Sequence, residues 1–281
     1  MTDDLQSWIG RTRRVADEMA TPLVRRMAAL TDRSDVALDR GAVVPNHWLT
    51  MLFDDAQPQS QLGPDGHPSK GDFLPPVPLP RRMLGGRRLT YHAPVHVGDA
   101  LERETAIAAI TPKVGRSGAM IFVMLRHTIT GPNGLLAVEE QDVAYLEAKR
   151  NAPAPPEKPA ETPTAEWRDA WRPDPVVLFR FSALAFNGHR IHYDADYARD
   201  GEGYPALVVN GSVSTLFLFE ALLRRNPGRQ IASYEARTMQ PVFCDRPAFL
   251  CADAPGADGA RNLWVEKDDG AMAIRIKTRL T

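Results

Sequence analysis

Apolar and polar positions alternate through much of the first half of the chain, which is the pattern of half-buried β-strands. The alternating segments are residues 101–110, 120–129 and 136–146, with a further strand expected at 88–92. Glycine-containing stretches at 115–118 and 131–134 have the composition of turns. The first half therefore predicts an antiparallel meander in its later part.

The region before this meander has helical signals. Leu5, Trp8 and Ile9 recur at helical spacing, and Thr21-Pro22 has the form of an N-cap followed by proline, starting a helix that runs to about Leu30. Residues 45–53 predict a short buried helix. Residues 57–80 are crowded with glycine and proline and predict a long loop, a type of segment that is often functional.

A proline-rich segment divides the chain. Residues 151–164 consist mainly of Pro, Ala and Glu, which favours an extended spacer over packed core. We therefore predict an N-terminal domain at 1–150, a linker at 151–165 and a C-terminal domain at 166–281.

The second half has its own order of elements. Residues 176–181 predict a strand, 193–198 a helical turn and 213–225 an amphipathic helix with Leu216, Phe219, Leu222 and Leu223 on one face. Further strands are expected at 231–239, 248–252, 263–266 and 271–280. A helix followed by an antiparallel sheet predicts an α+β fold class.

Composition excludes several classes of protein. The chain is 43% hydrophobic with a net charge of -1, so it is globular and has no basic field for nucleic acid. Only Cys244 and Cys251 are present, which argues against a disulfide scaffold or a structural zinc site. There is no signal peptide, no membrane-length apolar run, no metal-ligand cluster and no Gly-rich phosphate loop. We expect a cytoplasmic protein without a metal, and no nucleic-acid or membrane partner.

The densest chemistry lies in residues 181–194. His189 and His192 can exchange protons near neutral pH, and Asn187 can hold a water molecule because an amide both donates and accepts. Gly188 is expected to allow a tight turn there. These groups are suited to delivering water to a double bond.

The segment resembles the signature of the MaoC-like, (R)-specific enoyl-CoA hydratase family, which runs Gly-Asp-x-Asn-Pro-Leu-His. His192 falls on the catalytic histidine and Asn187 on the catalytic aspartate, while Phe186 replaces the glycine. His189 takes the place of the asparagine and Arg190 that of the proline. The run Asn210-Gly211-Ser212 resembles the start of the family's central helix.

Within that family, residues 186–194, 78–83 and 85–87 are similar to the hydroxyacyl-thioester dehydratase type 2 branch and its mesaconyl-CoA hydratases. The resemblance covers nearly the whole chain. It implies a double hot-dog fold, with two antiparallel sheets each wrapping a central helix. It also implies an N-terminal half that lacks the catalytic pair but shapes the acyl-CoA site, and it allows a homodimer.

The resemblance leads to a one-base hypothesis. Asn187 orients the water, and His192 removes a water proton as the hydroxyl adds to Cβ and then protonates Cα. The backbone N–H groups of Gly211 and Ser212, at a helix N-terminus, would stabilise the charge on the thioester oxygen, and Asn210 beside them is a further candidate substrate-binding residue. His189 and Arg190 are candidate substrate contacts.

Several of these residues also have simpler explanations. His192 could be a buried structural histidine, Arg190 an ion-pair partner, and the Gly211 region ordinary turn chemistry. Arginines suit CoA phosphates or a substrate carboxylate, but they are equally expected on a solvated surface. The candidate arginines are Arg81, Arg82, Arg87 and Arg88.

The leading prediction is a hydro-lyase that hydrates a short dicarboxylic 2-enoyl-CoA, such as mesaconyl-C4-CoA or itaconyl-CoA, to a citramalyl-type product. Coenzyme A is then part of the substrate and no separate cofactor is expected. A 3-hydroxyacyl-thioester dehydratase of fatty acyl chains is the alternative within the same chemistry. A thioesterase would need a carboxylate at position 187. An inactive acyl-CoA-binding subunit is the non-enzymatic alternative.

Overall fold

The computed structural model describes residues 5–53, 56–67, 73–79, 81–115, 118–147 and 163–281. Most of the predicted linker, and the middle of the turn predicted at 115–118, lie outside these residues. The boundaries of the linker therefore stay a prediction.

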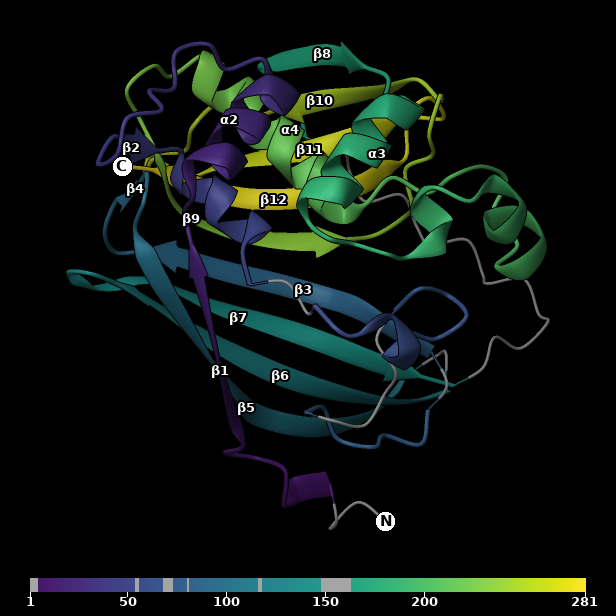
Figure 1. The fold of residues 1–281 in the computed structure, drawn as a ribbon. Coiled ribbons are helices and arrows are strands. Elements are labelled where there is room, and N and C mark those ends of the chain that lie inside the picture. Colours follow the sequence, from purple (N-terminus) through teal and green to yellow (C-terminus); the bar gives the residue numbers. More distant parts are fainter. Residues whose placement is uncertain (1–4, 54–55, 68–72, 80, 116–117, 148–162) are drawn as a thin grey trace.

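A ten-stranded antiparallel sheet forms the body of the protein, in the order β1-β5-β6-β7-β3-β9-β12-β11-β10-β8 (Figure 1). The first five strands of this order come from the N-terminal half: β1 (Thr12–Glu18), β3 (Arg81–Tyr91), β5 (Ala100–Gly115), β6 (Gly118–Gly131) and β7 (Gly134–Leu146). The other five come from the C-terminal half: β8 (Trp167–Trp171), β9 (Ile231–Thr238), β10 (Ala248–Ala252), β11 (Arg261–Lys267) and β12 (Met272–Leu280). The halves join where β3 pairs with β9, from Arg87 opposite Ala236 to Thr90 opposite Ser233. The predicted double hot-dog architecture is confirmed.

Figure 1 shows three helices among the C-terminal strands in the upper part of the view, while β3, β7, β6 and β5 lie below them. They are α2 (Thr21–Thr31), α3 (Pro175–Leu184) and α4 (Gly211–Arg224). Helix α4 is the central one, because it packs on β10, β11 and β12 and most of its side chains are buried. One apolar core contains the buried residues of α2 and α4 together with side chains of β3, β7, β9 and β12. No helix of the described ranges is both long enough and apolar enough to span a bilayer.

The remaining short elements complete the N-terminal half. A two-stranded ribbon pairs β2 (Val43–Val44) with β4 (Val95–His96). The 3₁₀ helices η1 (Asn46–Met51) and η2 (Gln59–Gln61) precede β3. The predicted buried helix at 45–53 is therefore present as η1, and every side chain of η1 except Thr50 is buried.

The predicted strand at 176–181 is wrong. Those residues lie in α3, where Asp174 accepts a hydrogen bond from the Val177 N–H at 2.8 Å and Pro175 occupies the first turn. An Asp-Pro start is the capping signal that should have decided between strand and helix, because a short apolar run fits both.

Strands β1 and β8 were missed, and both are edge strands of the sheet. In β1 the side chains alternate between exposed and half-buried, so the strand has no fully buried face to produce an apolar pattern. The helix predicted from Leu5 extends only through the first residues before a turn, and the chain enters β1 at Thr12.

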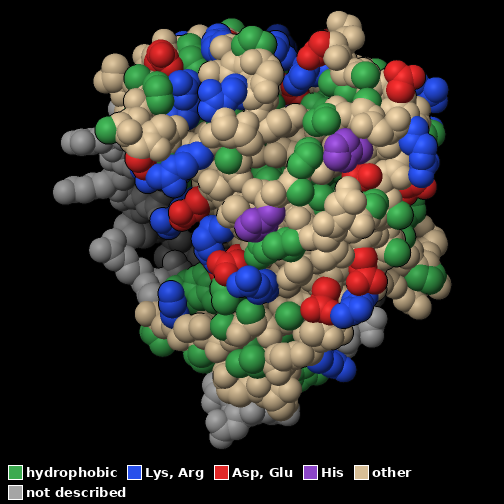
Figure 2. Space-filling model, turned by 90° about the vertical axis from the view of Figure 1, so that its left-hand side faces the viewer, with side chains coloured by type: hydrophobic (Ala, Val, Ile, Leu, Met, Phe, Trp, Pro, Cys, Tyr) green, Lys and Arg blue, Asp and Glu red, His purple; other side chains and the backbone are tan. Residues whose placement is uncertain are grey.

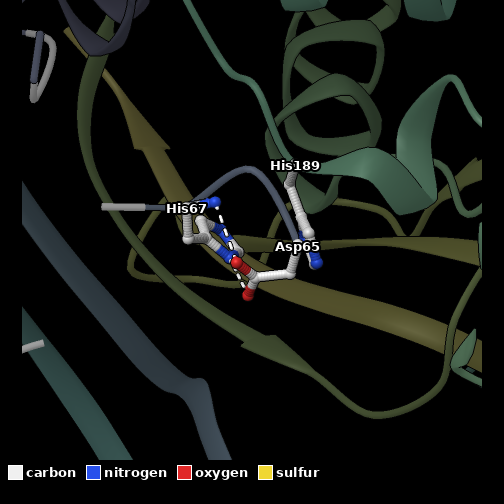
Figure 3. A group of neighbouring side chains, drawn as sticks. All are labelled: Asp65, His67 and His189. Carbon is white, nitrogen blue, oxygen red and sulfur yellow. Dashed lines mark hydrogen bonds and ion pairs between the residues drawn. The ribbon is translucent and has the colours of Figure 1, made fainter. Parts of the chain in front are cut away.

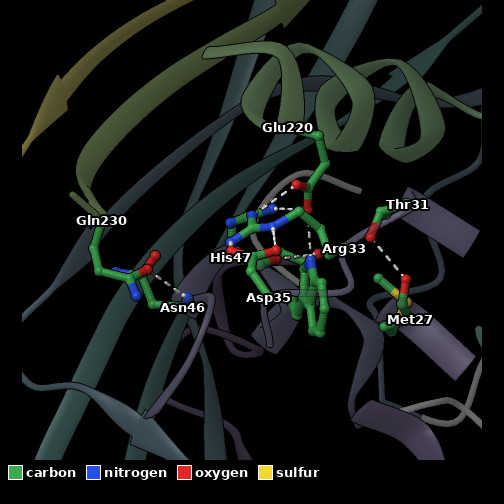
Figure 4. A network of polar contacts seen from close by, with 10 residues as sticks. Met27, Thr31, Arg33, Asp35, Asn46, His47, Glu220 and Gln230 are labelled. Atoms are coloured by element: carbon green, nitrogen blue, oxygen red, sulfur yellow. Dashed lines mark hydrogen bonds and ion pairs between the residues drawn. The ribbon is translucent and has the colours of Figure 1, made fainter. Parts of the chain in front are cut away.

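A buried charge cluster joins the two halves (Figure 4). The fully buried carboxylate of Glu220 on α4 accepts hydrogen bonds from His47 Nε2 at 2.9 Å and Trp48 Nε1 at 2.8 Å, both on η1. Arg33, after α2, donates to its other oxygen at 3.0 Å. Burial raises the pKa of Glu220, but the charge of His47 and the hydrogen bonds from these donors outweigh it and lower the pKa to about 2.

The face of the molecule that Figure 2 shows has no large patch of side chains with the same charge. Lys and Arg side chains lie interspersed with Asp and Glu there, as expected for a chain with a net charge of -1.

Candidate active site

A cavity of about 650 Å³ is lined by residues of both halves. Strand β3 contributes Arg82, Met83 and Leu84 to its wall, and the N-terminus of α4 contributes Gly211 and Ser212. Asn187, His189 and His192 line the same cavity. The structure therefore brings most of the residues predicted for the chemistry into one space.

His192 ends the single 3₁₀ turn η3 (Arg190–His192) and is 7% exposed. Its Nδ1 lies 2.7 Å from the Val208 carbonyl oxygen. A carbonyl can only accept, so Nδ1 carries the proton and Nε2 is left as a proton acceptor. Burial lowers the pKa of His192, the hydrogen bond to Val208 opposes this, and the nearby His67 acts in the same direction as burial. At neutral pH the ring is therefore in the form that a general base requires.

Asn187 is held in one orientation. The side-chain Oδ1 of Asn187 accepts the backbone N–H of His189 at 3.0 Å. The backbone N–H of Asn187 donates to the Ser182 carbonyl at 2.9 Å. Because Oδ1 is fixed as the acceptor, the Nδ2 amide is the group that this side chain can offer to a water molecule.

The start of α4 differs in one detail from the prediction. Asn210 is the N-cap, and its Oδ1 accepts the Ser212 N–H at 2.8 Å. The Ser212 N–H is thus already engaged and is not the second oxyanion donor that the sequence predicted. The Gly211 N–H stays a prediction, because the first N–H groups of a helix have no partner within it and carry its positive dipole.

Arg190 supports the site rather than lining it. Its guanidinium pairs with Asp194 Oδ2 at 2.8 Å, lies 4.2 Å from the Tyr197 ring centre and donates to the Pro64 carbonyl at 3.0 Å. The last contact ties the loop of the N-terminal half to the motif of the C-terminal half. Arg190 does not line the cavity, and its contacts are those of the ion-pair partner that was the alternative.

His189 lies against two residues that sequence reasoning missed, Asp65 and His67 (Figure 3). The His67 and His189 ring centres are 3.9 Å apart, and the His189 and His192 ring centres 5.3 Å. One nitrogen or oxygen from each of Asp65, His67 and His189 lies within 4.8 Å of the others, which is close enough for a metal ion. However, both Asp65 oxygens already accept hydrogen bonds from His67, so the group is internally satisfied without an ion.

The four arginines separate clearly. Arg82 lines the cavity, whereas Arg81 does not. Arg87 pairs with Glu139 at 2.7 Å, away from the cavity. Arg88 pairs with Glu140 and Asp142 at 3.0 and 2.8 Å. Of these four arginines, Arg82 is the one that lies where it can meet a substrate carboxylate in the cavity.

Two glycines meet where the halves touch. Gly66 has φ +84°, and a Cβ added there would overlap with the Gly188 carbonyl oxygen. Gly188 is required by this close approach rather than by the tight turn predicted for it. Phe186, which replaces the family's glycine, has φ 45°, so this position adopts the left-handed backbone that glycine favours.

Known proteins are similar to this chain along most of its length. The family model described as hydroxyacyl-thioester dehydratase type 2 matches residues 46–244. A protein of Chloroflexus aurantiacus named mesaconyl-C(4)-CoA hydratase is 40% identical over 281 residues, covering 99% of this chain and 98% of that protein. The mitochondrial hydroxyacyl-thioester dehydratase type 2 of Schizosaccharomyces pombe is 28% identical, covering 77% of this chain and 78% of that one.

Solved structures share the fold at low sequence identity. A MaoC-like dehydratase from Phytophthora capsici superimposes with a TM-score of 0.73 at 17% identity, covering 100% of this chain and 99% of that one. A Mycobacterium tuberculosis protein described as having a double hot-dog fold gives 0.61 at 16% identity, with 99% and 98% covered. The chain therefore belongs to the hydroxyacyl-thioester dehydratase type 2 family of MaoC-like, double hot-dog hydro-lyases.

Proposed function

We propose that the protein hydrates a short dicarboxylic 2-enoyl-CoA of the mesaconyl-C4-CoA type to a citramalyl-type CoA, with itaconyl-CoA as a second candidate substrate. The observation that carries the proposal is one cavity that holds a proton-accepting imidazole (His192), an amide donor (Asn187) and an arginine (Arg82). The similarity along nearly the whole chain to a protein named mesaconyl-C(4)-CoA hydratase supports the choice of reaction.

Each group has a defined part in hydration. The Asn187 Nδ2 amide donates to the water oxygen, and His192 Nε2 takes one of the water's protons as the oxygen bonds to Cβ of the enoyl group. Electrons of the double bond then move towards the thioester oxygen. The Gly211 N–H at the N-terminus of α4 stabilises the negative charge that develops there.

Arg82 is the feature that favours a dicarboxylic acyl group. A guanidinium binds a carboxylate through charge-assisted hydrogen bonds, which an unsubstituted acyl chain cannot accept. The same wall also carries Met83 and Leu84, and the β6 and β7 strands add Leu125 and Val143. These apolar side chains keep dehydration of fatty acyl thioesters as the second candidate.

The decisive experiment incubates the purified protein with mesaconyl-C4-CoA, itaconyl-CoA, crotonyl-CoA and a ten-carbon 2-enoyl-CoA. Loss of enoyl-thioester absorbance measures hydration, and a thiol reagent measures release of free CoA. We expect hydration of the dicarboxylic substrates at the highest kcat/KM and no release of CoA. His192→Gln is expected to reduce kcat by about 100-fold or more, the range that a general base contributes.

The other outcomes point to the other functions. Preference for the ten-carbon substrate would make the protein a fatty acyl dehydratase, and release of CoA would make it a thioesterase. Binding of the substrates with no turnover of any of them would make it an inactive acyl-CoA-binding subunit.

A further inference from the structure

The loop before β3 places His67 in the wall of the cavity. Asp65 holds the residue twice, because Oδ1 accepts the His67 backbone N–H at 3.0 Å and Oδ2 lies 3.2 Å from the ring Nδ1. A carboxylate accepts from a ring N–H, so Nδ1 carries a proton and Nε2 is left for other partners (Figure 3).

The loop is also fixed against the motif of the other half. The Arg190 backbone N–H donates to the Asp65 carbonyl at 2.9 Å, and the Arg190 side chain donates to the Pro64 carbonyl at 3.0 Å. The Gly66–Gly188 approach leaves no space between the two backbones. His67 is thus positioned by the same turn that carries His192.

Three imidazoles follow one another along this part of the cavity, and their surroundings differ. Burial lowers the pKa of His189 to about 3, with the charges of His67 and His192 acting in the same direction, so His189 stays neutral. His192 has a carbonyl oxygen and no carboxylate at its Nδ1. Partial burial disfavours the Asp65 carboxylate, but the hydrogen bonds from His67 outweigh this and lower the pKa of Asp65.

An ionised carboxylate stabilises a protonated imidazole, whereas burial without such a partner favours the neutral ring. When two titratable groups of one site have such different surroundings, one group can act as the acid and the other as the base. His67 therefore has the environment of the acid, and His192 that of the base.

We propose that His67, positioned by Asp65, is a second catalytic residue, which delivers a proton to Cα in hydration and removes it in dehydration. The proposal rests on the hydratase function proposed above and replaces the one-base hypothesis. Asn187 can neither give up nor take a proton in this role. The carboxylate that the general MaoC-like signature has at this position is here supplied by Asp65, acting through an imidazole of the N-terminal half.

Water loses a proton to His192 Nε2 and its oxygen bonds to Cβ. The π electrons pass to Cα, which takes the proton from His67 Nε2, so one imidazole gains a proton while the other loses one. Exchange with solvent restores both, and dehydration runs the sequence in reverse.

The test compares His67→Gln and Asp65→Asn with a matched control, His96→Gln. His96 makes the same local pair, with its Nδ1 3.3 Å from Asp99 Oδ2, but it does not line the cavity. We expect His67→Gln to lower kcat for hydration by about 100-fold with little change in KM, and His96→Gln to leave kcat unchanged.

The pH profile separates a catalytic from a merely structural role. A base and an acid acting together give kcat a rising and a falling limb with pH, whereas a base alone gives only the rising limb. The titratable and charged groups around His67 are Asp65 on its own loop, His189 and His192 on the motif, and Arg82 on β3. We expect His67→Gln to abolish the falling limb. Asp65→Asn should also lower kcat, because the His67 ring loses the carboxylate that orients it.

The experiment distinguishes failure of the hydratase function from failure of the role proposed for His67. If the unaltered protein hydrates no enoyl-CoA, the proposed function itself fails. If the unaltered protein is active and His67→Gln keeps kcat within threefold, or keeps both limbs, the role of His67 is overturned. Loss of activity on dialysis against EDTA, restored by Zn²⁺, would also overturn it, since the cluster would then be a metal site. Asp65→Asn serves as the second variant if His67→Gln does not fold.

Discussion

Replacing Glu220 by glutamine tests whether the buried charge cluster holds the two halves together. The substitution keeps the shape of the side chain and removes its charge, so His47 loses its anionic partner and Arg33 keeps only the exposed carboxylate of Asp35. An ordinary glutamate pKa of 4.5 is lowered here to about 2. A difference of this size corresponds to about 3 kcal/mol of stability, which agrees with the cost of breaking buried ion pairs. Solvent does not screen this interaction, because the Glu220 side chain is fully buried.

The sign of the pH dependence follows from the lowered pKa. A carboxylate whose pKa is lower in the folded state stabilises the fold above the pKa of the unfolded state, and this contribution disappears as the pH falls towards the folded-state value. Urea unfolding should therefore show Glu220→Gln about 3 kcal/mol less stable than the unaltered protein at neutral pH. The gap should shrink below about pH 4.5 and fall to less than half at about pH 3.

Asp35 supplies the matched control. It pairs with the same Arg33 at 2.6 Å, but its side chain is 66% exposed. Asp35→Asn should cost no more than about 1 kcal/mol, as exposed ion pairs do. A Glu220→Gln variant within 1 kcal/mol of the unaltered protein at neutral pH, or a gap that stays constant down to about pH 3, would refute the reasoning.

Three further predictions concern the cavity. Gly66→Ala should lower kcat by about tenfold or more through overlap with the opposite carbonyl oxygen, whereas Gly10→Ala, at the same left-handed φ but in open space, should leave kcat unchanged. Arg82→Ala should raise KM for dicarboxylic enoyl-CoA by about 10- to 100-fold and KM for crotonyl-CoA much less, while the control variant Arg81→Ala should change neither. Equal effects on both substrates would assign Arg82 to the binding of CoA instead. Asn187→Asp should move the rising limb of the pH–kcat/KM profile to higher pH, because a new negative charge favours the protonated form of the adjacent base. An unmoved limb would show that the position 187 side chain does not face that base.

The sequence predicted the strands with one buried face and the central helix well, and failed where burial is weak. Strands β5, β6 and β7 were all predicted, and each extends a few residues beyond its predicted limits. Edge strands β1 and β8 pair on one side only, so few of their side chains are buried and the apolar period is faint. Helix α3 was mistaken because its apolar run satisfies both periods.

The active site was predictable only as far as it is local in sequence. His192 and Asn187 stand five residues apart and were found together, whereas Asp65 and His67 lie in a glycine- and proline-rich loop more than 100 residues earlier. No periodicity connects such a loop with the motif. The available signal was a pair of titratable residues flanking a glycine within a long loop, which is where functional residues gather.

The loop with Asp65 and His67 gives the N-terminal half a larger part in the site than the resemblance implied. The resemblance implied an N-terminal half that only shapes the site, yet that half contributes Arg82 and His67 to the cavity wall. Arg190 contacts the loop through both its backbone and its side chain, and it also pairs with Asp194. A change that loosens this turn would therefore displace His192 and His67 together. Under the two-residue mechanism the C-terminal half supplies the base and the N-terminal half the acid, so neither half contains both groups.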